Sequence, residues 1–347
     1  MTAKQPVVAF RREPDLQEAC LDVLVGRSEP MRAIIEAIRK TSLSPSSVLV
    51  RGETGTGKEL VARAIHHMGQ DRNKPFVTVD CGGLAPTLIE SELFGHVRGA
   101  FTGADSHREG LLEAARGGTL FLDEIAELPL HLQSRLLRAC QEREFRPLGS
   151  TKQIGFGARI IAATNQDLEA SVARGNFRKD LFYRLNVVSL VLPPLRGRKE
   201  DVPALAESFL RRPAVLSATN RPAVPRSLCP KALDCLLAYD WPGNVRELEN
   251  CLLYAVTLGD SSTIHVKDLP VAVRCPSARN AFFNPPEVLP LAVIESRTIL
   301  RTLAEVGGDK LLAAKLLGIG KTTLYRKLKE YSRRNQPDGR DRSSRLP

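Results

Sequence analysis

The sequence has no uninterrupted apolar run that approaches the roughly 18 residues needed to cross a membrane. Its first residues lead into the charged group Arg11-Arg12-Glu13, which does not fit the apolar segment of a secretory signal. Neither a membrane partner nor secretion is indicated, and we expect a cytoplasmic protein.

The chain also lacks paired cysteines. Its seven cysteines are scattered, with no Cys-x-x-Cys pair and no histidine at the spacing of a zinc site. We therefore interpret Cys81, Cys140, Cys235 and Cys251 as small core residues rather than as metal ligands.

What the chain does have is length and an uneven positive charge. Its 347 residues, 43% of them hydrophobic, can bury the cores of about two or three domains. The formal net charge is +11, and residues 285–347 contain 13 Lys and Arg against 7 Asp and Glu. This excess predicts a polyanionic partner for the C-terminal part of the chain.

A glycine-rich segment follows the apolar run Ser47–Val50 and precedes the helical pattern Leu60–Ile65. Strand, glycine-rich turn and helix form the setting of a phosphate-binding loop, because backbone N–H groups and the helix N-terminus then face the phosphates. Lys58 reaches the terminal phosphates. Glu59 stands where this motif usually has the Ser or Thr that binds Mg²⁺. The predicted ATP contacts in this loop are Gly52, Glu53, Thr54, Gly55, Thr56, Gly57, Lys58 and Glu59.

Residues 117–124 form a second short apolar run, which ends in two carboxylates. At the end of a buried strand, Asp123 is placed to hold Mg²⁺ directly or through water. Glu124 is placed to polarise the water that attacks the γ-phosphate. A solvated strand end is the alternative for this run alone, and its pairing with the glycine-rich loop favours ATP hydrolysis.

Between these two motifs lies a six-residue stretch that phosphate binding does not require. An apolar Phe101 stands beside Thr102, and two glycines bracket them, which is typical of a loop tip held out from a scaffold. A buried hairpin with Phe101 as a core plug is the alternative. The stretch comprises Gly99, Ala100, Phe101, Thr102, Gly103 and Ala104.

The basic C-terminal part carries a helical pattern over residues 291–303, which ends at Gly307-Gly308. A short apolar helix over 311–317, a glycine turn and a basic helix over 321–329 then predict a bihelical DNA-binding unit. A dimerising helical hairpin is the alternative. The predicted core comprises Ala314, Leu317, Ile319, Leu324 and Leu328, and the predicted DNA contacts are Lys321, Thr322, Thr323, Tyr325, Arg326 and Lys327.

Seven motifs occur in the order seen in one bacterial family. They resemble those of the enhancer-binding proteins, which are AAA+ ATPases that activate sigma-54 RNA polymerase, and the resemblance spans residues 24–270. The C-terminal unit resembles the Fis-type helix-turn-helix of the same family. The motifs are GETGTGKE, ESELFGH, GAFTGA, GGTLFLDE, FRKDLFYRLN, LPPLRGRKEDV and YDWPGNVRELEN.

The resemblance implies further roles. Asn165 corresponds to the polar residue that senses the γ-phosphate, and Arg246 to the lid arginine that reports the nucleotide state. Arg178 and Arg184 correspond to arginine fingers that reach the site of a neighbouring subunit, which requires a ring. Residues 99–104 correspond to the loop that contacts sigma-54.

Two departures from the family pattern stand out. Asp80 occupies the position of an Asn that bonds the catalytic glutamate in many relatives, and a carboxylate facing Glu124 is expected to repel it. Only about 23 residues precede Leu24, where most relatives have a receiver or ligand-sensing domain. The sequence therefore predicts restraint by a separate protein or by expression level.

The predicted fold class is α/β: an AAA+ P-loop αβα sandwich with a parallel sheet, a helical lid subdomain and a small all-α helix-turn-helix domain. The expected strands are 48–50, 76–79, 119–122, 159–163 and 187–191. The expected divisions are an N-terminal extension at 1–23, the αβα subdomain at 24–196, the lid at 197–270, a linker at 271–286, the DNA-binding domain at 287–331 and a disordered basic tail at 332–347.

Together these features predict a transcription activator that hydrolyses ATP with Mg²⁺. Its expected partners are double-stranded enhancer DNA, the sigma-54 RNA polymerase holoenzyme and other copies of itself, from dimer to hexamer. A paralogue in the ring and a trans-acting negative regulator remain open. The alternatives are another AAA+ machine acting on DNA, such as a helicase loader, and a repressor built on an inactive ATPase.

Overall fold

The computed structural model describes residues 26–83, 86–211, 227–259, 261–274, 291–307 and 309–334. It divides into two units, Met1–Arg274 and Cys275–Pro347, each with its own hydrophobic core. The predicted N-terminal extension, the linker beyond Arg274 and the tail beyond Arg334 lie outside the described residues.

A five-stranded sheet with the order β2-β3-β6-β1-β7 is the centre of the first unit, and all its strands are parallel. The sequence-predicted strands and the α/β fold class are thus confirmed. The strands are β1 (Val48–Arg51), β2 (Phe76–Asp80), β3 (Thr119–Asp123), β6 (Arg159–Thr164) and β7 (Val188–Val191).

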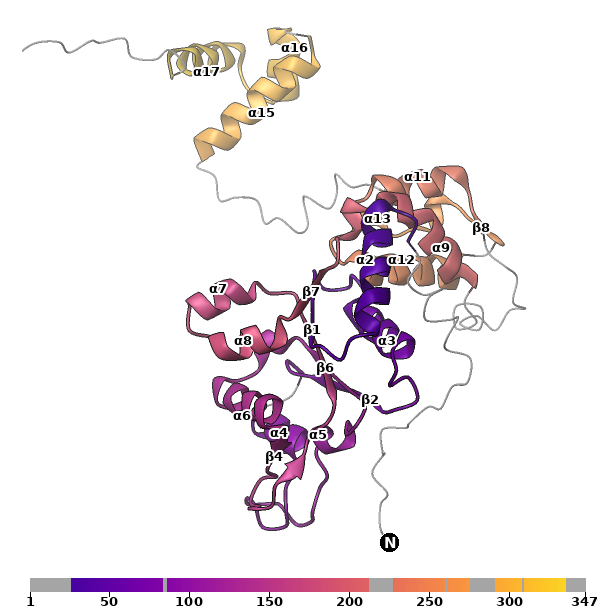
Figure 1. The fold of residues 1–347 in the computed structure, drawn as a ribbon. Coiled ribbons are helices and arrows are strands. Elements are labelled where there is room, and N and C mark those ends of the chain that lie inside the picture. The colour runs from indigo at the N-terminus through magenta and orange to yellow at the C-terminus, as the bar shows by residue number, and fades with distance from the viewer. Residues whose placement is uncertain are drawn as a thin grey trace, which may run out of the picture. The chain divides into compact units, whose positions relative to one another are not determined.

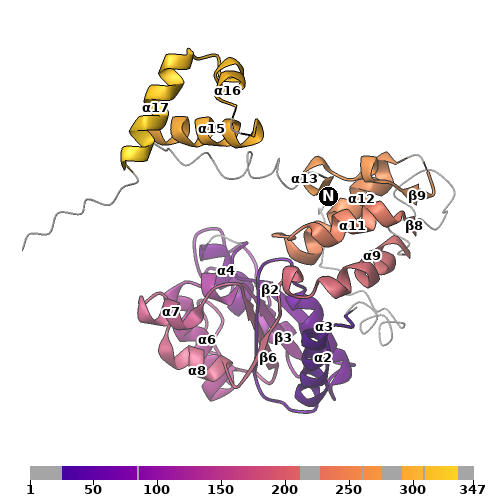
Figure 2. The same ribbon diagram turned by 90° about the horizontal axis from the view of Figure 1, so that it is seen from above.

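Helices cover both faces of this sheet, as Figures 1 and 2 show from two directions. On one face, α2 (Glu29–Ser42) and α3 (Lys58–Met68) pack against β1 and its neighbours. The other face carries α4 (Pro86–Phe94), α5 (Leu111–Ala114), α6 (Leu130–Glu142), α7 (Leu168–Ala173) and α8 (Lys179–Leu185).

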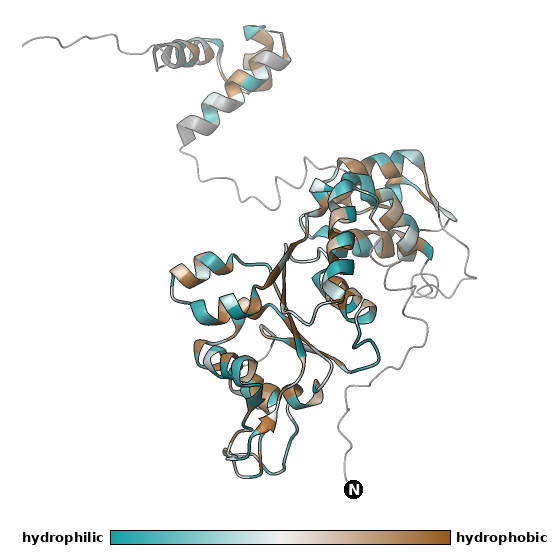
Figure 3. Cartoon of the chain, viewed as in Figure 1, coloured by the Kyte–Doolittle hydropathy of each residue, from teal (hydrophilic) through white to brown (hydrophobic). Residues whose placement is uncertain are grey.

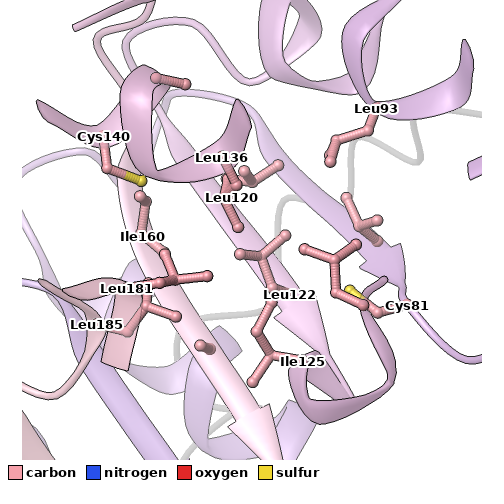
Figure 4. Packing of buried hydrophobic residues seen from close by; sticks show 14 of the residues in the cluster. Cys81, Leu93, Leu120, Leu122, Ile125, Leu136, Cys140, Ile160, Leu181 and Leu185 are labelled. Atoms are coloured by element: carbon pink, nitrogen blue, oxygen red, sulfur yellow. The ribbon is translucent and has the colours of Figure 1, made fainter. Parts of the chain in front are cut away.

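The central strands of the sheet are buried because helices cover them on both sides. All six residues of β6 are buried, as are the first four of β3, and the strand β6 is coloured mostly as hydrophobic in Figure 3. Leu120 and Leu122 meet Leu136 of α6 and Leu181 of α8 in the core drawn in Figure 4. This rigid core fixes the carboxyl ends of the strands, where the predicted catalytic residues lie.

The predicted helical lid follows the sheet and packs around Trp241, which is fully buried. The lid also contains a two-stranded parallel pair, β8 (Ser227–Leu228) with β9 (Thr263–Ile264), which the sequence did not reveal. Its helical elements are η2 (Leu195–Gly197), η3 (Lys199–Asp201), α9 (Val202–Arg211), α11 (Pro230–Ala238), α12 (Asn244–Leu258), η4 (Val266–Asp268) and α13 (Val271–Arg274).

The described residues of the second unit form three helices at the predicted positions. Leu324 is fully buried between them, together with Ile299, Ala313 and Ala314, while the other predicted core residues pack around this centre partly buried. Asp309 caps the second helix by accepting bonds from two backbone N–H groups. The helices are α15 (Leu291–Glu305), α16 (Lys310–Leu316) and α17 (Lys321–Arg334).

Two short segments complete the first unit beside α6. The hairpin of β4 (Glu144–Phe145) and β5 (Ile154–Gly155) follows α6, and η1 (Ile125–Glu127) precedes it. Cys81, Cys140 and Cys251 are buried as predicted, whereas Cys235 is only partly buried. Within the described ranges, none of the helices is long and apolar enough to cross a membrane.

The buried His66 of α3 makes the stability of the first unit sensitive to pH. Its Nδ1 lies 2.9 Å from the Thr119 hydroxyl, and burial lowers the pKa of His66 to about 4 from 6.5. An unfolded chain takes up this proton at a higher pH than the folded one does. The free energy of unfolding should therefore fall by about 3 kcal/mol between pH 6.5 and pH 4 through this group.

Urea unfolding at several pH values, compared between the wild-type protein and His66→Asn, checks this expectation. The variant should lose less stability on acidification because it has no imidazole to protonate. Parallel losses in both proteins would show that His66 does not contribute.

Candidate nucleotide site and its associated surfaces

The glycine-rich loop lies between β1 and α3, at the carboxyl edge of the sheet. Gly57 adopts φ of 101° as the residue before α3, and Gly55 adopts φ of 79°. Both conformations favour glycine, and a Cβ atom at Gly55 would also clash with the Gly243 carbonyl oxygen of the lid. Glycine is thus required here both for the turn and for close approach of the lid.

Lys58 and Glu124 form the central contact of this site. Lys58 Nζ lies 3.2 Å from Glu124 Oε1 and donates to the Gly52 carbonyl oxygen at 3.1 Å, with only 7% of its side chain exposed. The Asn165 backbone N–H donates to Glu124 Oε2 at 3.1 Å, and its side-chain amide donates to the Thr54 hydroxyl at 3.0 Å. The structure therefore brings five of the predicted ATPase residues together.

Three carboxylates stand close to one another beside this contact. Burial, together with the charges of Glu124 and Asp80, raises the pKa of Asp123, although one hydrogen bond from the Glu124 N–H acts against this. A divalent cation would relieve such a concentration of negative charge. Among the described residues, no group of three or more His, Cys, Asp or Glu is arranged to hold a metal ion.

Two acidic residues that the sequence marks as unusual, Asp80 and Glu59, have partners of their own in the structure. Asp80 accepts bonds from the N–H groups of Gly82 and Gly83 at 3.0 and 3.1 Å, so its carboxylate closes a turn. Glu59 accepts two bonds from Arg63, one helical turn further on, at 2.9 and 2.7 Å. Among the bonds that the structure records, neither carboxylate bonds to Glu124 or Asp123.

Two residues near the glycine-rich loop have backbone conformations that are unusual for residues other than glycine. Glu124 has φ of 47° and Asn244 has φ of 52°, in the left-handed region that side chains other than glycine rarely adopt. Each conformation costs free energy and is maintained by surrounding contacts, which is common at functional sites. Asn244 is fully buried at the start of α12.

Sequence reasoning missed the residues that join the glycine-rich loop to the lid. Asn244 Nδ2 donates to the Thr54 carbonyl oxygen at 3.0 Å, and its Oδ1 accepts from the Leu195 N–H at 2.8 Å. Arg198 is 3% exposed and donates to the Thr56 carbonyl oxygen at 3.1 Å. Both lie inside motifs recognised in the sequence, but no pattern assigned them a contact.

Arg246 also stands at this junction. It is exposed on the first turn of α12, and its N–H lies 3.3 Å from the Gly55 carbonyl oxygen, which also accepts from Val245. The lid helix thus begins directly against the phosphate-binding loop, with the Arg246 side chain open to solvent.

The two predicted arginine fingers have their own partners outside the glycine-rich loop. Arg178 binds both carboxylate oxygens of Asp180, at 3.0 and 2.7 Å, and donates to the Ser134 hydroxyl at 3.2 Å. Arg184 donates to the Cys140 carbonyl oxygen at 2.7 Å. The structure does not bring either guanidinium to the P-loop of its own chain.

The loop that contains Phe101 is a short hairpin. Its stem pairs His96 with Arg108 through two backbone bonds, and its tip is closed by a bond from the Gly99 N–H to the Ala104 carbonyl oxygen at 2.9 Å. Phe101 is 47% exposed and touches the His96 ring edge to face, with 5.1 Å between centroids. The side chain lies on the surface and does not plug a core.

The base of this hairpin rests on the β4–β5 hairpin and on α4. Val97 donates its N–H to the Leu148 carbonyl oxygen at 3.1 Å. Arg135 of α6 forms an ion pair with Glu90 of α4, lies 4.1 Å above the Phe94 ring and donates to the Arg146 carbonyl oxygen at 2.8 Å. One arginine therefore joins three segments that support the loop.

The predicted DNA contacts lie along α17, which begins at Lys321. Lys321, Thr322, Tyr325 and Arg326 are exposed, and Thr323 is partly buried. Lys327 differs, because its Nζ lies 2.6 Å from Glu295 of α15 with 22% of its side chain exposed. This ion pair joins two helices of the unit.

Comparisons with known proteins agree with this organisation. Residues 24–191 match the Sigma-54 interaction domain, residues 196–281 the AAA+ ATPase lid domain, and residues 290–331 the Fis family of bacterial regulatory proteins.

Similar proteins cover most of the chain. The transcriptional regulatory protein ZraR of Salmonella typhimurium is 46% identical over 88% of this chain and 68% of its own length. The response regulator PilR of Pseudomonas aeruginosa is 44% identical over 92% and 72%. The crystal structure of NtrX from Brucella abortus in complex with ADP is 34% identical, with a TM-score of 0.66, over 91% of this chain and 71% of that one.

The motifs, the parallel sheet with its lid and the matched domains lead to one assignment. The chain belongs to the family of AAA+ ATPases that activate sigma-54-dependent transcription and that carry a Fis-type helix-turn-helix.

Proposed function

We propose that this chain binds enhancer DNA, assembles into a hexameric ring and uses ATP hydrolysis to convert the closed complex of sigma-54 RNA polymerase into the open complex. The observation that carries this proposal is the hairpin at residues 95–109. It holds an exposed Phe101 on a scaffold that also brings Lys58 and Glu124 together beside the glycine-rich loop.

ATP is the proposed substrate. The solved NtrX structures include complexes with ADP and with ATP, and this chain has the corresponding glycine-rich loop and lid. Residues 52–59 would bind the phosphates through backbone N–H groups, and Arg246 would meet them from the lid. Asp123 would hold Mg²⁺, which supplies charge neutralisation to the phosphates when bound.

The proposed hydrolysis step begins at the contact between Lys58 and Glu124. Phosphates would draw the Lys58 ammonium away from Glu124, because a polyphosphate carries more negative charge than one carboxylate. Glu124 would then accept a proton from a water molecule while the water oxygen bonds to the γ-phosphorus. The bond from that phosphorus to the β,γ-bridging oxygen breaks, and ADP leaves with the electron pair. Asn165 would hold Glu124 and register the γ-phosphate.

Arg178 and Arg184 are proposed to complete the site of a neighbouring subunit. Their guanidinium groups have partners on α6 and α8 and none of the recorded bonds joins them to the P-loop of the same chain. A cationic side chain from the next subunit would neutralise charge in the transition state, so hydrolysis would depend on assembly.

The hairpin tip is proposed to contact sigma-54 through residues 99–104. Its stem continues from α4, which leads back through Asp80 to the carboxyl edge of the sheet. A change at the γ-phosphate would therefore shift the tip through packed elements. The helix-turn-helix would place Lys321, Thr322, Thr323, Tyr325 and Arg326 at DNA, with Lys327 supporting the helix through Glu295.

The first test separates binding from chemistry. Lys58→Ala should abolish detectable ATP binding, whereas Glu124→Ala should bind ATP and lose turnover by at least about a hundredfold, since it removes the group that activates water. Calorimetric titration and phosphate release measure the two quantities, with Glu142→Gln on the exposed part of α6 as the control. Turnover at the wild-type rate in Glu124→Ala would refute its role.

The second test concerns the ring. Arg178→Ala and Glu124→Gln should each be inactive alone, and mixing them should restore roughly a quarter of the wild-type ATPase rate, because some interfaces then pair an intact pocket with an intact finger. Arg174→Ala, which removes another exposed arginine nearby, should keep its activity. No recovery on mixing, with assembly verified by ultracentrifugation, would place Arg178 outside the catalytic site.

The third test concerns the hairpin tip. Phe101→Ala and Thr102→Ala should retain ATP binding, assembly and most hydrolysis but lose capture of sigma-54 in the presence of ADP and aluminium fluoride. Since Phe101 is half exposed, its truncation should cost far less than the ~3–5 kcal/mol of a buried Phe. Leu43→Ala, at the exposed end of α2, is the control. Normal capture of sigma-54 by both tip variants would refute the proposal that this hairpin contacts sigma-54.

A further inference from the structure

The glycine-rich loop contains an acidic residue that opposes its task. Glu53 lies directly after Gly52 and directly before Thr54, whose hydroxyl bonds to Asn165. A carboxylate in a loop that binds a triphosphate would repel it, because like charges a few ångströms apart near a protein surface interact by kilocalories per mole. Something must compensate Glu53 if the loop is to bind a polyanion.

Arg196 is the compensating group. Both of its terminal nitrogens donate to the two carboxylate oxygens of Glu53, one at 2.8 Å, in a bidentate ion pair. This bond holds the pKa of Glu53 below its usual range, so the carboxylate is ionised at neutral pH. Bidentate pairs of this kind fix orientation as well as charge.

The pair stands where three parts of the ATPase meet. Glu53 belongs to the phosphate-binding loop, Arg196 to η2 between the sheet and the lid, and Asn244 to the first turn of lid helix α12. Asn244 Nδ2 also donates to Glu53 Oε2 at 3.2 Å. The charge of Glu53 is therefore used to hold the lid and the connecting segment on the loop.

We propose that Arg196 is a positioning residue that neutralises Glu53, so that an acidic phosphate-binding loop can bind a nucleotide polyphosphate while the same carboxylate holds the lid in place. The proposal rests on the nucleotide site assigned above. It concerns binding in the purified protein and involves neither sigma-54 nor DNA.

Affinity for ADP and for the non-hydrolysable analogue AMP-PNP, measured by calorimetry on the full chain, tests the charge relation. Arg196→Ala should weaken both by about tenfold or more, and AMP-PNP by the larger factor because it carries one more phosphate. Glu53→Gln alone should tighten binding a few-fold, since it removes the negative charge while the amide oxygen can still accept bonds from Arg196 and Asn244. The double variant should recover to within about threefold of wild type.

Two further measurements distinguish the effect of the Arg196 charge on nucleotide binding from the effect of its side-chain shape. The loss of nucleotide affinity caused by Arg196→Ala should become smaller as ionic strength rises, because salt screens exposed charges. Arg196→Lys should recover most of the affinity, since it keeps the charge but not the planar fork. Arg211→Ala, which breaks an exposed ion pair with Glu207 at the end of α9, is the matched control for loss of one arginine.

Wild-type affinity in a folded Arg196→Ala protein would overturn the proposal. So would a double variant as weak as the single one, because Arg196 would then act on the nucleotide itself or on folding. If Arg196→Ala does not fold, the other two single variants test the proposal. Weaker nucleotide binding in Glu53→Gln would overturn it. So would a loss of nucleotide affinity in Arg196→Lys that does not change with salt concentration. Loss of sigma-54 activity with this binding pattern intact would count against the proposed function alone.

Discussion

The contact between Lys58 and Glu124 is the interaction on which the nucleotide site depends. It holds the cation that would bind phosphate and the carboxylate that would activate water in one partly buried ion pair. Removing either partner alone would leave a charge without compensation. In the proposed mechanism, nucleotide phosphates would compete for this lysine, so that substrate binding and activation of the carboxylate would become one event. The sheet makes this possible because β1 and β3 bring both residues to its carboxyl edge.

From this contact, two routes lead to the rest of the protein. One runs through Thr54 and Asn244 into the lid, whose first helical turn bonds directly to the phosphate-binding loop. The other runs through the turn after Asp80 and α4 to the hairpin that carries Phe101. Arg135 braces this second route by joining α4, α6 and the β4–β5 hairpin. In the proposed mechanism, local changes at the phosphates would reach the hairpin through these packed elements.

Much of this organisation could be predicted from the sequence because its signals are local. Short apolar runs that alternate with helical stretches predicted the five strands. The spacing of Gly55, Gly57 and Lys58 predicted the phosphate-binding loop between the first strand and the helix that follows it. The sequence could not predict where long side chains find their partners. The carboxylate of Asp80, for instance, closes a turn by accepting bonds from two backbone N–H groups. The ion pair of Lys327 with Glu295 likewise depends on packing between two helices, and the predicted contact of Lys327 with DNA stays a prediction.

Open-complex formation at a promoter of the −24/−12 type, followed by permanganate reactivity of unpaired thymines, tests the central claim most directly. The account predicts reactivity only when this protein, sigma-54 holoenzyme and hydrolysable ATP are all present, and none when AMP-PNP replaces ATP. Promoter opening without hydrolysis, or opening with a holoenzyme that lacks sigma-54, would contradict it.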